Sequence, residues 1–135
     1  MAKLTHFDDH GNAHMVDISE KQNSFRTAKA ACSIQMSLET LKIIADGSAK
    51  KGDVLNVARI AGIQGAKKTS DLIPLCHPIS LTKVNLDLTL NEKIPGIEII
   101  STVKTTGPTG VEMEALTAAS ISALTVYDMV KSLDK

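Results

Sequence analysis

Aromatic side chains are scarce in this sequence, which has two phenylalanines, one tyrosine and no tryptophan among its 135 residues. Proteins that bind single-stranded nucleic acid commonly stack the bases on aromatic side chains, so this kind of binding is not expected. An excess of one charge is also missing, because fifteen acidic side chains balance fifteen basic ones. A formal charge of zero gives no bulk attraction for nucleic acid or for a membrane surface. We therefore expect neither as a partner.

Disulfides, membrane spans and an export signal are not expected either. The two cysteines, Cys32 and Cys76, are too few for a disulfide scaffold, and no apolar run is long enough to cross a bilayer. The first residues are polar and lack the apolar centre of a signal peptide. These features predict a cytoplasmic protein with reduced thiols and a core of Ala, Ile, Leu, Val and Met.

The chain is long enough to form one domain with its own core. Residues 1–23 are polar with scattered apolar side chains, which predicts an irregular N-terminal arm. Such arms often reach a neighbouring subunit. The change to regular apolar patterning after this arm predicts a single domain over residues 24–135.

Six elements are predicted in this domain, in the order strand, helix, helix, strand, strand, helix. Alternating apolar and polar residues predict strands at residues 25–36, 84–90 and 97–105. Helical periodicity predicts helices that begin after Ser37, after Asp53 and after Gly110. With one helix set aside, this order matches the first five elements of the split β-α-β-β-α-β sandwich, an α+β, ferredoxin-like fold with an antiparallel sheet and helices on one face. The final strand has no sequence left to form it, so either the sheet has three strands or a tail is missing.

The last predicted helix carries Glu112 and Glu114 at its start and Asp128 and Lys131 near its end. Glu114 and Asp128 are fourteen residues apart in sequence, which corresponds to about 21 Å on a straight helix. One small ligand cannot contact both ends, so two functional ends would belong to different composite sites, each completed by another segment or subunit. The small residues in the middle of the helix would allow close packing in an oligomer. The alternative is an exposed helix with solvated charges.

Asp128 and Lys131 have the i, i+3 spacing that brings two side chains to one face of a helix. An exposed pair of this kind contributes only ~0.3–0.5 kcal/mol to stability, whereas in a cleft it is a workable acid–base pair. Lys50 and Lys51 lie in a glycine-flanked segment that could close over a polyphosphate or another anion. A solvated surface loop is the alternative for this segment.

The turn at residues 105–110 resembles an anion-binding turn before a helix, but Glu112 and Glu114 in the first helical turn would repel phosphate. Carboxylates there suit a ligand with paired N–H donors, such as the edge of a guanine or of a reduced pterin. The alternative is a capped connection in which the two acids simply complement the helix dipole.

Cys76 and His77 lie between two prolines. A zinc site needs three or four ligands, and Cys32 on a predicted buried strand face is a poor candidate for another. A nucleophilic dyad is a weak hypothesis because adjacent side chains seldom point at each other. His77 is better suited to hydrogen bonding or proton transfer.

Four segments of the sequence closely resemble the molybdenum cofactor biosynthesis protein C family. They are HMVDIS (14–19), KKGDVLNVARIAGIQGAKKT (50–69), DLIPLCHPI (71–79) and TGPTGVEMEALTAASISALTVYDMVK (106–131). The resemblance implies a ferredoxin-like subunit of a homohexamer, a trimer of dimers with active sites at the dimer interfaces. It also implies the activity of a cyclic pyranopterin monophosphate synthase. This lyase of molybdenum cofactor biosynthesis converts 3′,8-cyclo-7,8-dihydroguanosine 5′-triphosphate to cyclic pyranopterin monophosphate and pyrophosphate.

The resemblance further implies which residues form the site. The family's catalytic aspartate falls on Asp128, and its essential lysines fall on Lys51 and Lys131. Its substrate-binding and site-lining positions fall on Leu75, Cys76, His77, Glu112, Met113, Glu114, Lys67, Arg26 and Asp17. Lys67 and Arg26 are expected to contact the triphosphate, and Glu112 or Glu114 the N–H groups of the base. No metal ligand is implied, and whether a divalent ion accompanies the triphosphate stays open.

This chain departs from the family at its C-terminus. Members usually continue with a glycine-rich segment that carries a further lysine and then with a last strand, whereas this chain stops at Lys135. We expect that a mobile tail is missing. One alternative function is a ferredoxin-like regulatory module that binds a nucleotide or amino acid at a subunit interface without chemistry. Another is an inactive structural oligomer.

Overall fold

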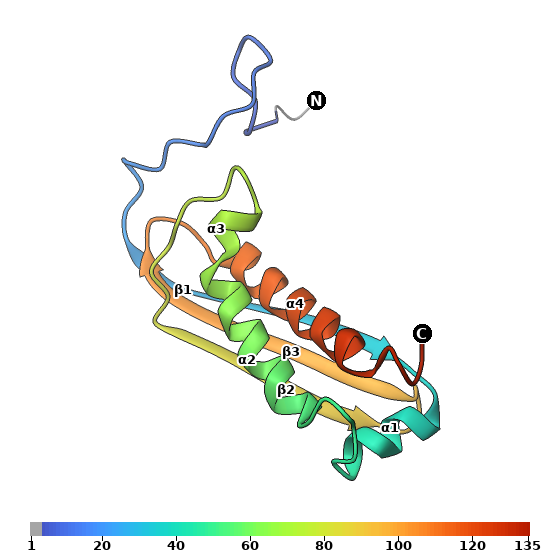
Figure 1. Ribbon diagram of the computed structural model, residues 1–135. Helices are drawn as coiled ribbons and strands as arrows, with labels where there is room; N and C mark the ends of the chain where they lie inside the picture. Colours follow the sequence, from blue (N-terminus) through green and yellow to red (C-terminus); the bar gives the residue numbers. More distant parts are fainter. Residues whose placement is uncertain (1–3) are drawn as a thin grey trace.

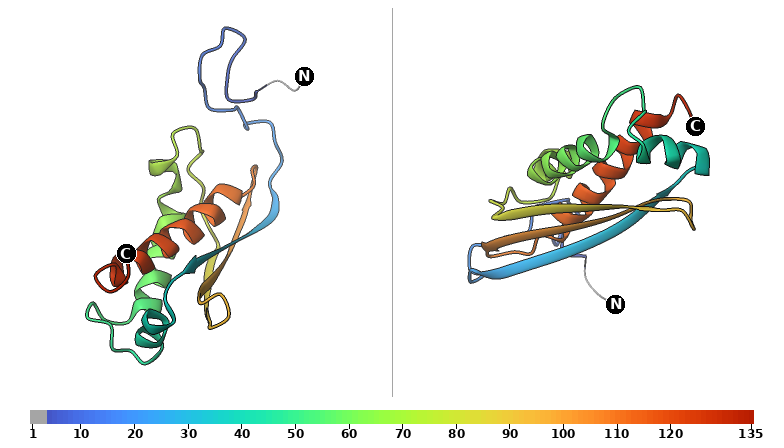
Figure 2. Two further views of the ribbon diagram at one scale, coloured as in Figure 1. Left: turned by 90° about the vertical axis from the view of Figure 1, so that its right-hand side faces the viewer. Right: turned by 90° about the horizontal axis from the view of Figure 1, so that it is seen from below.

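A three-stranded antiparallel sheet forms one layer of the molecule in the computed structural model, which describes residues 4–135. The strands are β1 (Ser24–Gln35), β2 (Lys83–Asn91) and β3 (Gly96–Gly107), and their order in the sheet is β1-β3-β2. The helices are α1 (Leu38–Ala45), α2 (Val54–Lys67), α3 (Thr69–Leu72) and α4 (Glu112–Val130). The helices α2 and α4 lie across the same face of the sheet (Figure 1, Figure 2). The predicted α+β, ferredoxin-like arrangement is confirmed.

The observed elements differ from the predicted ones in detail. The third strand extends to Gly107, two residues beyond its predicted end. The short helix α3 was not predicted, because a single helical turn is too short to show periodicity. The hydroxyl of Thr69 donates to the carbonyl oxygens of Gly65 and Ala66 at 3.2 and 2.9 Å. These bonds tie α3 to the end of α2.

The core lies between the sheet and the two long helices. The central strand β3 supplies its most buried side chains, with Ile97, Ile99 and Val103 fully buried. Ala28 and Ala30 on β1 are also buried, on the face that the alternation of apolar residues predicts. Most of this core is aliphatic, as the scarcity of aromatic residues requires.

Close packing of α2 against α4 depends on small residues in both helices. A Cβ atom on Gly62 of α2 would lie 3.0 Å from the backbone oxygen of Ala118 in α4. The hydroxyl of Ser122 donates to the carbonyl oxygen of Ala58 at 3.0 Å. The buried small residues of α4 include Ala115, Ala118, Ala119 and Ser122. These four side chains pack against α2 and the sheet and so cannot form the expected oligomer contact, whereas Ser120 in the same part of α4 is exposed.

The N-terminal arm precedes β1 and contains one short bridge between Phe7 and Ala13. Its first part projects beyond the end of the sheet at which β1 begins (Figure 1, Figure 2). Residues 1–3 of the predicted arm lie outside the described residues. Among residues 4–135, no helix has both the length and the apolar character needed to span a membrane.

Candidate active site

Three charged side chains meet at the C-terminal end of α4. Lys131 Nζ lies 3.1 Å from Asp128 Oδ1, and Lys51 Nζ lies 3.4 Å from Asp128 Oδ2. Lys51 Nζ also donates to the carbonyl oxygen of Asp128 at 3.0 Å. The fold thus brings together the three residues that were expected to be catalytic, although Lys51 is 77 residues from Asp128 in sequence.

The connection between α1 and α2 positions Lys51. It ends at Asp53, whose carboxylate accepts from the backbone N–H of Asn56 at 3.1 Å and so caps α2, as predicted. Gly52 has a φ of +104°, a conformation that favours glycine. Ala49 is buried and anchors the middle of the connection. Lys51 therefore lies in a loop that is anchored in its middle by Ala49 and at its end by the Asp53 cap.

The electrostatics of this cluster keep Asp128 ionised. The hydrogen bond from Lys131, followed by the positive charges of Lys51 and Lys131, lowers the pKa of the Asp128 carboxyl below its ordinary value of 3.8. At neutral pH the cluster is a carboxylate with an ammonium group beside each oxygen. Such a group can accept a proton from a substrate atom or orient a lysine that donates one.

A pocket lies at the opposite end of α4. The six predicted substrate-binding residues that line it are Leu75, Cys76, His77, Glu112, Met113 and Glu114. They come from the segment after α3 and from the first turn of α4, so the fold brings them together from two parts of the chain. An adjoining hollow is lined by Thr105, Gly107 and Thr109 among others, and His77 lines both.

Glu114 is the buried carboxyl of this pocket, with 4% of its surface exposed. Burial raises the pKa of Glu114 above its ordinary value, and the negative charge of Glu112 raises it further. Proton exchange at Glu114 therefore occurs at a higher pH than for an exposed glutamate. Its carboxylate can accept hydrogen bonds from N–H groups of a bound ligand, as can that of the exposed Glu112.

Cys76 is not activated as a nucleophile. Burial, followed by the charge of Glu114, raises the pKa of the Cys76 thiol above its ordinary value of 9.0, which keeps it protonated. Cys32 is half-buried on β1, and its thiol donates to the carbonyl oxygen of Ala119 at 3.4 Å. Within residues 4–135, no three His, Cys, Asp or Glu side chains are grouped closely enough to hold a metal ion.

The remaining predicted site residues lie around this end of the molecule. Arg26 Nε donates to the carbonyl oxygen of Gly107 at 3.0 Å and so ties β1 to the turn before α4. The carboxylate of Asp17 accepts from the backbone N–H of Ser19 at 2.9 Å. This bond is the main cause of a lowered Asp17 pKa, to which the charge of nearby His77 also contributes. Lys67 is the exposed last residue of α2.

Sequence reasoning did not assign four residues that line the pocket: His6, Ile79, Thr109 and Gly110. Thr109 and Gly110 belong to the turn that the sequence suggested as an anion-binding turn, so a signal for them was present. Ile79 ends one of the segments that resemble the family. His6 lies in the irregular arm, where no pattern indicated that it contacts the pocket.

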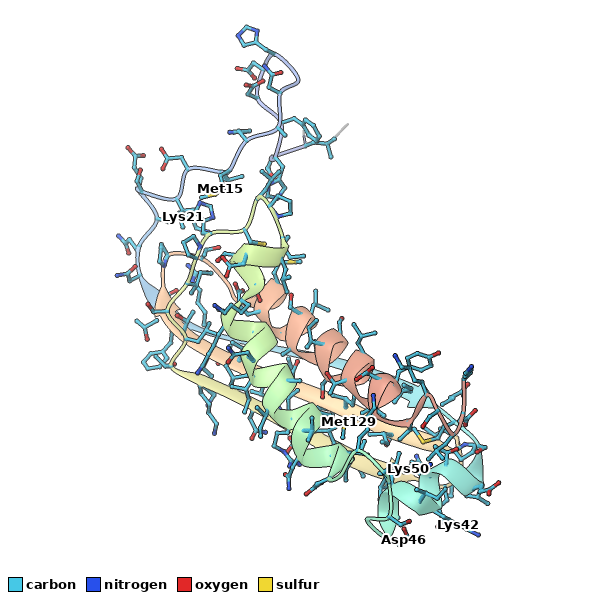
Figure 3. All side chains as sticks on the ribbon, viewed as in Figure 1. Met15, Lys21, Lys42, Asp46, Lys50 and Met129 are labelled. Carbon is cyan, nitrogen blue, oxygen red and sulfur yellow. The ribbon has the colours of Figure 1, made fainter. Side chains whose placement is uncertain are left out.

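The two groups of site residues are separated along the length of α4. Because fourteen residues of helix correspond to about 21 Å, one small ligand cannot touch both Glu114 and Asp128 of the same chain. Figure 3 shows Asp46 and Lys50, which belong to the connection between α1 and α2, at the opposite end of the molecule from Met15 and Lys21 of the arm. A single chain therefore carries two separate groups of candidate site residues.

Comparison with known proteins adds to this geometry. A sequence model of the MoaC family matches residues 15–135. The chain belongs to the MoaC family. Among its relatives is the cyclic pyranopterin monophosphate synthase of Jannaschia sp. (strain CCS1), which is 62% identical over 135 residues that make up all of this chain and 83% of the relative. The proteins of the same name from Dinoroseobacter shibae and Cereibacter sphaeroides (strain ATCC 17029) are 62% and 59% identical, and the chain covers 85% of each.

Membership of the MoaC family confirms the resemblance seen in the four sequence segments. All four fall within or overlap the matched range, which includes every predicted site residue. The identity extends over the whole chain, so it covers both halves of the candidate site and the arm that precedes β1.

Proposed function

We propose that this chain is a cyclic pyranopterin monophosphate synthase of molybdenum cofactor biosynthesis. The reaction converts 3′,8-cyclo-7,8-dihydroguanosine 5′-triphosphate to cyclic pyranopterin monophosphate with release of pyrophosphate. The observation that carries the proposal is the cluster of Asp128 between Lys51 and Lys131, at one end of a helix whose other end borders a pocket with two carboxyl groups. Full-length identity of about 60% to relatives with this name supports it.

Asp128, Lys51 and Lys131 perform the proton transfers. Opening the purine ring and building the pyran ring require protons to be removed and added at several atoms. The ionised Asp128 accepts a proton, and the two ammonium groups donate protons or stabilise developing negative charge. Because Asp128 contacts both lysines, its negative charge compensates part of the positive charge of each ammonium group.

The pocket at the start of α4 binds the base. Glu112 and Glu114 accept hydrogen bonds from the 2-amino group and the ring N–H. Leu75, Cys76 and Met113 supply walls, and His77 supplies a further group for hydrogen bonding or proton transfer.

Basic groups near the pocket hold the triphosphate. Arg26 uses its Nε–H to bind Gly107, and the guanidinium keeps further N–H donors for phosphate oxygens. Lys67 adds a flexible ammonium group, whereas Asp17 orients the arm beside His77. A divalent ion would neutralise part of the phosphate charge if it accompanies the substrate.

The complete site forms between subunits of a cytoplasmic homohexamer, a trimer of dimers. Exposed apolar side chains follow one face of α4 and support such a contact: Met113, Leu116, Leu124 and Tyr127. Val57 and Ile60 of α2 are exposed as well. An association that buries these side chains would bring the Asp128 cluster of one subunit towards the pocket of another. In this assembly residues 24–135 form the catalytic domain, and residues 1–23 form an arm.

Incubation with the cyclic dihydro-GTP substrate tests the function, with pyrophosphate release and product formation as the two readouts. We expect both to appear together and in equal amounts. Substrate binding without either product would instead identify a regulatory nucleotide-binding module. Size-exclusion chromatography with light scattering measures the oligomeric state, and a monomeric but active protein would contradict the composite site.

A further inference from the structure

The pocket at the start of α4 includes one side chain that comes from the arm. His6 lines it together with Cys76, His77, Glu112 and Glu114. Within the part of the chain that the structure describes, every other lining residue comes from residues 75–79 or 109–114. His6 therefore forms a wall that the domain itself does not provide.

Backbone bonds around His6 hold it in a closed hairpin. The N–H of His14 donates to the carbonyl oxygen of His6 at 2.9 Å. The next residue, Phe7, forms a bridge with Ala13. His6 thus lies at the base of a small hairpin. The backbone bond to His14 joins the two sides of this hairpin at His6 itself.

Asp8 organises the tip of the same hairpin. Its carboxylate accepts from the backbone N–H groups of His10 and Asn12, both at 2.9 Å. Its own N–H donates to the carbonyl oxygen of Asn12 at 2.8 Å. Gly11 has a φ of +80°, which allows the chain to reverse there. The arm therefore has a defined local structure that can position His6.

The chemistry of the pocket leaves a role for a hydrogen-bond donor. Ionised Glu112 and Glu114 can only accept hydrogen bonds, so they suit the N–H groups of a purine-derived base. On such a base a ring carbonyl oxygen lies next to these N–H groups, and it needs a donor. An imidazole N–H supplies one. His77 lines the adjoining hollow as well, whereas His6 lines only this pocket of the two.

We propose that His6 is a substrate-contacting residue that donates a hydrogen bond to the ring carbonyl oxygen of the guanine-derived base. This proposal rests on the proposed function and adds to it a residue that recognises the base by a hydrogen bond. The contact exists before and during the reaction, so it contributes to binding of the substrate and of the transition state alike.

Steady-state kinetics of three variants test the contact. His6→Ala is expected to raise KM by about 3- to 10-fold with kcat nearly unchanged, because it removes one hydrogen bond from both states. His6→Gln keeps an N–H donor and should recover part of the loss. His10→Ala is the matched control, because this histidine lies at the exposed tip of the same hairpin and contributes only its backbone N–H to the Asp8 carboxylate.

Nucleotide binding provides a readout that does not depend on turnover. Titration calorimetry with GTP and with 6-thioguanosine triphosphate should show a preference of the wild-type protein for GTP, because the thio analogue keeps the ring N–H and the 2-amino group but replaces the ring carbonyl oxygen with sulfur, a weaker hydrogen-bond acceptor. His6→Ala should lose most of that preference, and His10→Ala should keep it. If His6 has only a structural role, His6→Ala should weaken the binding of both nucleotides by the same factor.

The outcomes separate the contact from the function. Wild-type protein that binds GTP preferentially but releases no pyrophosphate from the cyclic substrate would refute the proposed function and leave the His6 comparison valid. The His6 contact is overturned if His6→Ala matches His10→Ala, if it lowers kcat without changing KM, or if wild-type protein binds the two nucleotides equally.

Discussion

Asp128 is held between two ammonium groups without being buried. Its side chain is 57% exposed, so the attraction to Lys51 and Lys131 is screened by water and contributes little to folding. The same arrangement lowers the pKa of the Asp128 carboxyl and places two proton donors within hydrogen-bonding distance of it or nearly so. We therefore expect substitution of Asp128 to change the reaction rate far more than the stability.

Asp128→Asn is expected to lower kcat by about 100-fold or more, because the amide cannot accept a proton from the substrate. Circular dichroism and oligomeric state should remain those of the wild type. Asp71→Asn is a matched control, since Asp71 forms an exposed i, i+3 contact of 3.9 Å with Lys68 far from this cluster. Equal pyrophosphate release by both variants would refute the catalytic role of Asp128.

Glu114 is in the opposite situation, because it is buried and no salt bridge to it is found within residues 4–135. Its folded-state pKa is raised above that of the unfolded chain. Ionisation of Glu114 therefore costs more in the folded state than in the unfolded state. The loss of stability develops as the pH rises from the ordinary value of 4.5 through the raised value, and it persists above that pH.

Glu114→Gln should therefore raise the melting temperature near neutral pH and have little effect in acid, below the ordinary glutamate pKa. Calorimetric melting curves across this pH range measure the effect. Glu92→Gln, at an exposed position in the β2–β3 connection, should show no such pH-dependent gain. A Glu114→Gln variant that is destabilised equally at every pH would contradict this account.

At the scale of the elements, the contact between α2 and α4 depends on the absence of a side chain at Gly62. A Cβ atom there would lie 2.9 Å from Leu86 Cγ and 3.0 Å from the carbonyl oxygen of Ala118. The leucine side chain can move, but the oxygen belongs to a helix backbone. The separation of the two helices is therefore set by this glycine.

Gly62→Ala should cost roughly 1–3 kcal/mol through overpacking and regain about 1 kcal/mol of helix propensity, so we expect a net destabilisation of up to about 2 kcal/mol. Chemical denaturation monitored by circular dichroism measures the change. Gln64→Ala, at an exposed position on the same helix, should be nearly neutral. A stabilised Gly62→Ala protein would show that the helices can separate without cost.

The elements were predictable where local chemistry decides them. Ser37 and Asp53 cap their helices as expected, because a side-chain oxygen just before a helix accepts a hydrogen bond from a backbone N–H of the first turn. The short α3 was missed because one turn carries no periodic signal. His6 was missed for a different reason, since its proximity to Glu114 depends on the path of the arm in space. The buried small residues of α4 pack against α2 and the sheet instead of another subunit, and sequence does not show which neighbour covers a helix face.

At the scale of the whole molecule, the two groups of candidate site residues lie at opposite ends of α4, and we propose that a partner subunit completes each of them. The proposed assembly brings the Asp128 cluster of one subunit to the pocket of another. Two chains with different defects, one in the Asp128 cluster and the other in the pocket, can then form one intact site together.

Glu114→Gln removes a carboxylate that the proposed site uses to bind the base, so mixed oligomers of Asp128→Asn and Glu114→Gln should be more active than oligomers of either variant alone. Random pairing makes half of the dimers mixed, and each mixed dimer contains one site with both halves intact, so about a quarter of wild-type activity is expected. Pyrophosphate release after refolding or co-expression of the two variants is the measurement. A mixture of wild-type protein with the double variant provides the control, and no recovery in the two-variant mixture would place both halves of each site in one chain.

Tyr127 gives the molecule a spectroscopic property that follows from its unusual composition. It is the one tyrosine of a chain without tryptophan, and it lies on the exposed apolar face of α4 immediately before Asp128. The intrinsic ultraviolet emission of the native chain therefore comes almost entirely from a single residue at the proposed subunit contact. Subunit dissociation or ligand entry near Asp128 should change this emission, so unlabelled protein can be followed in real time.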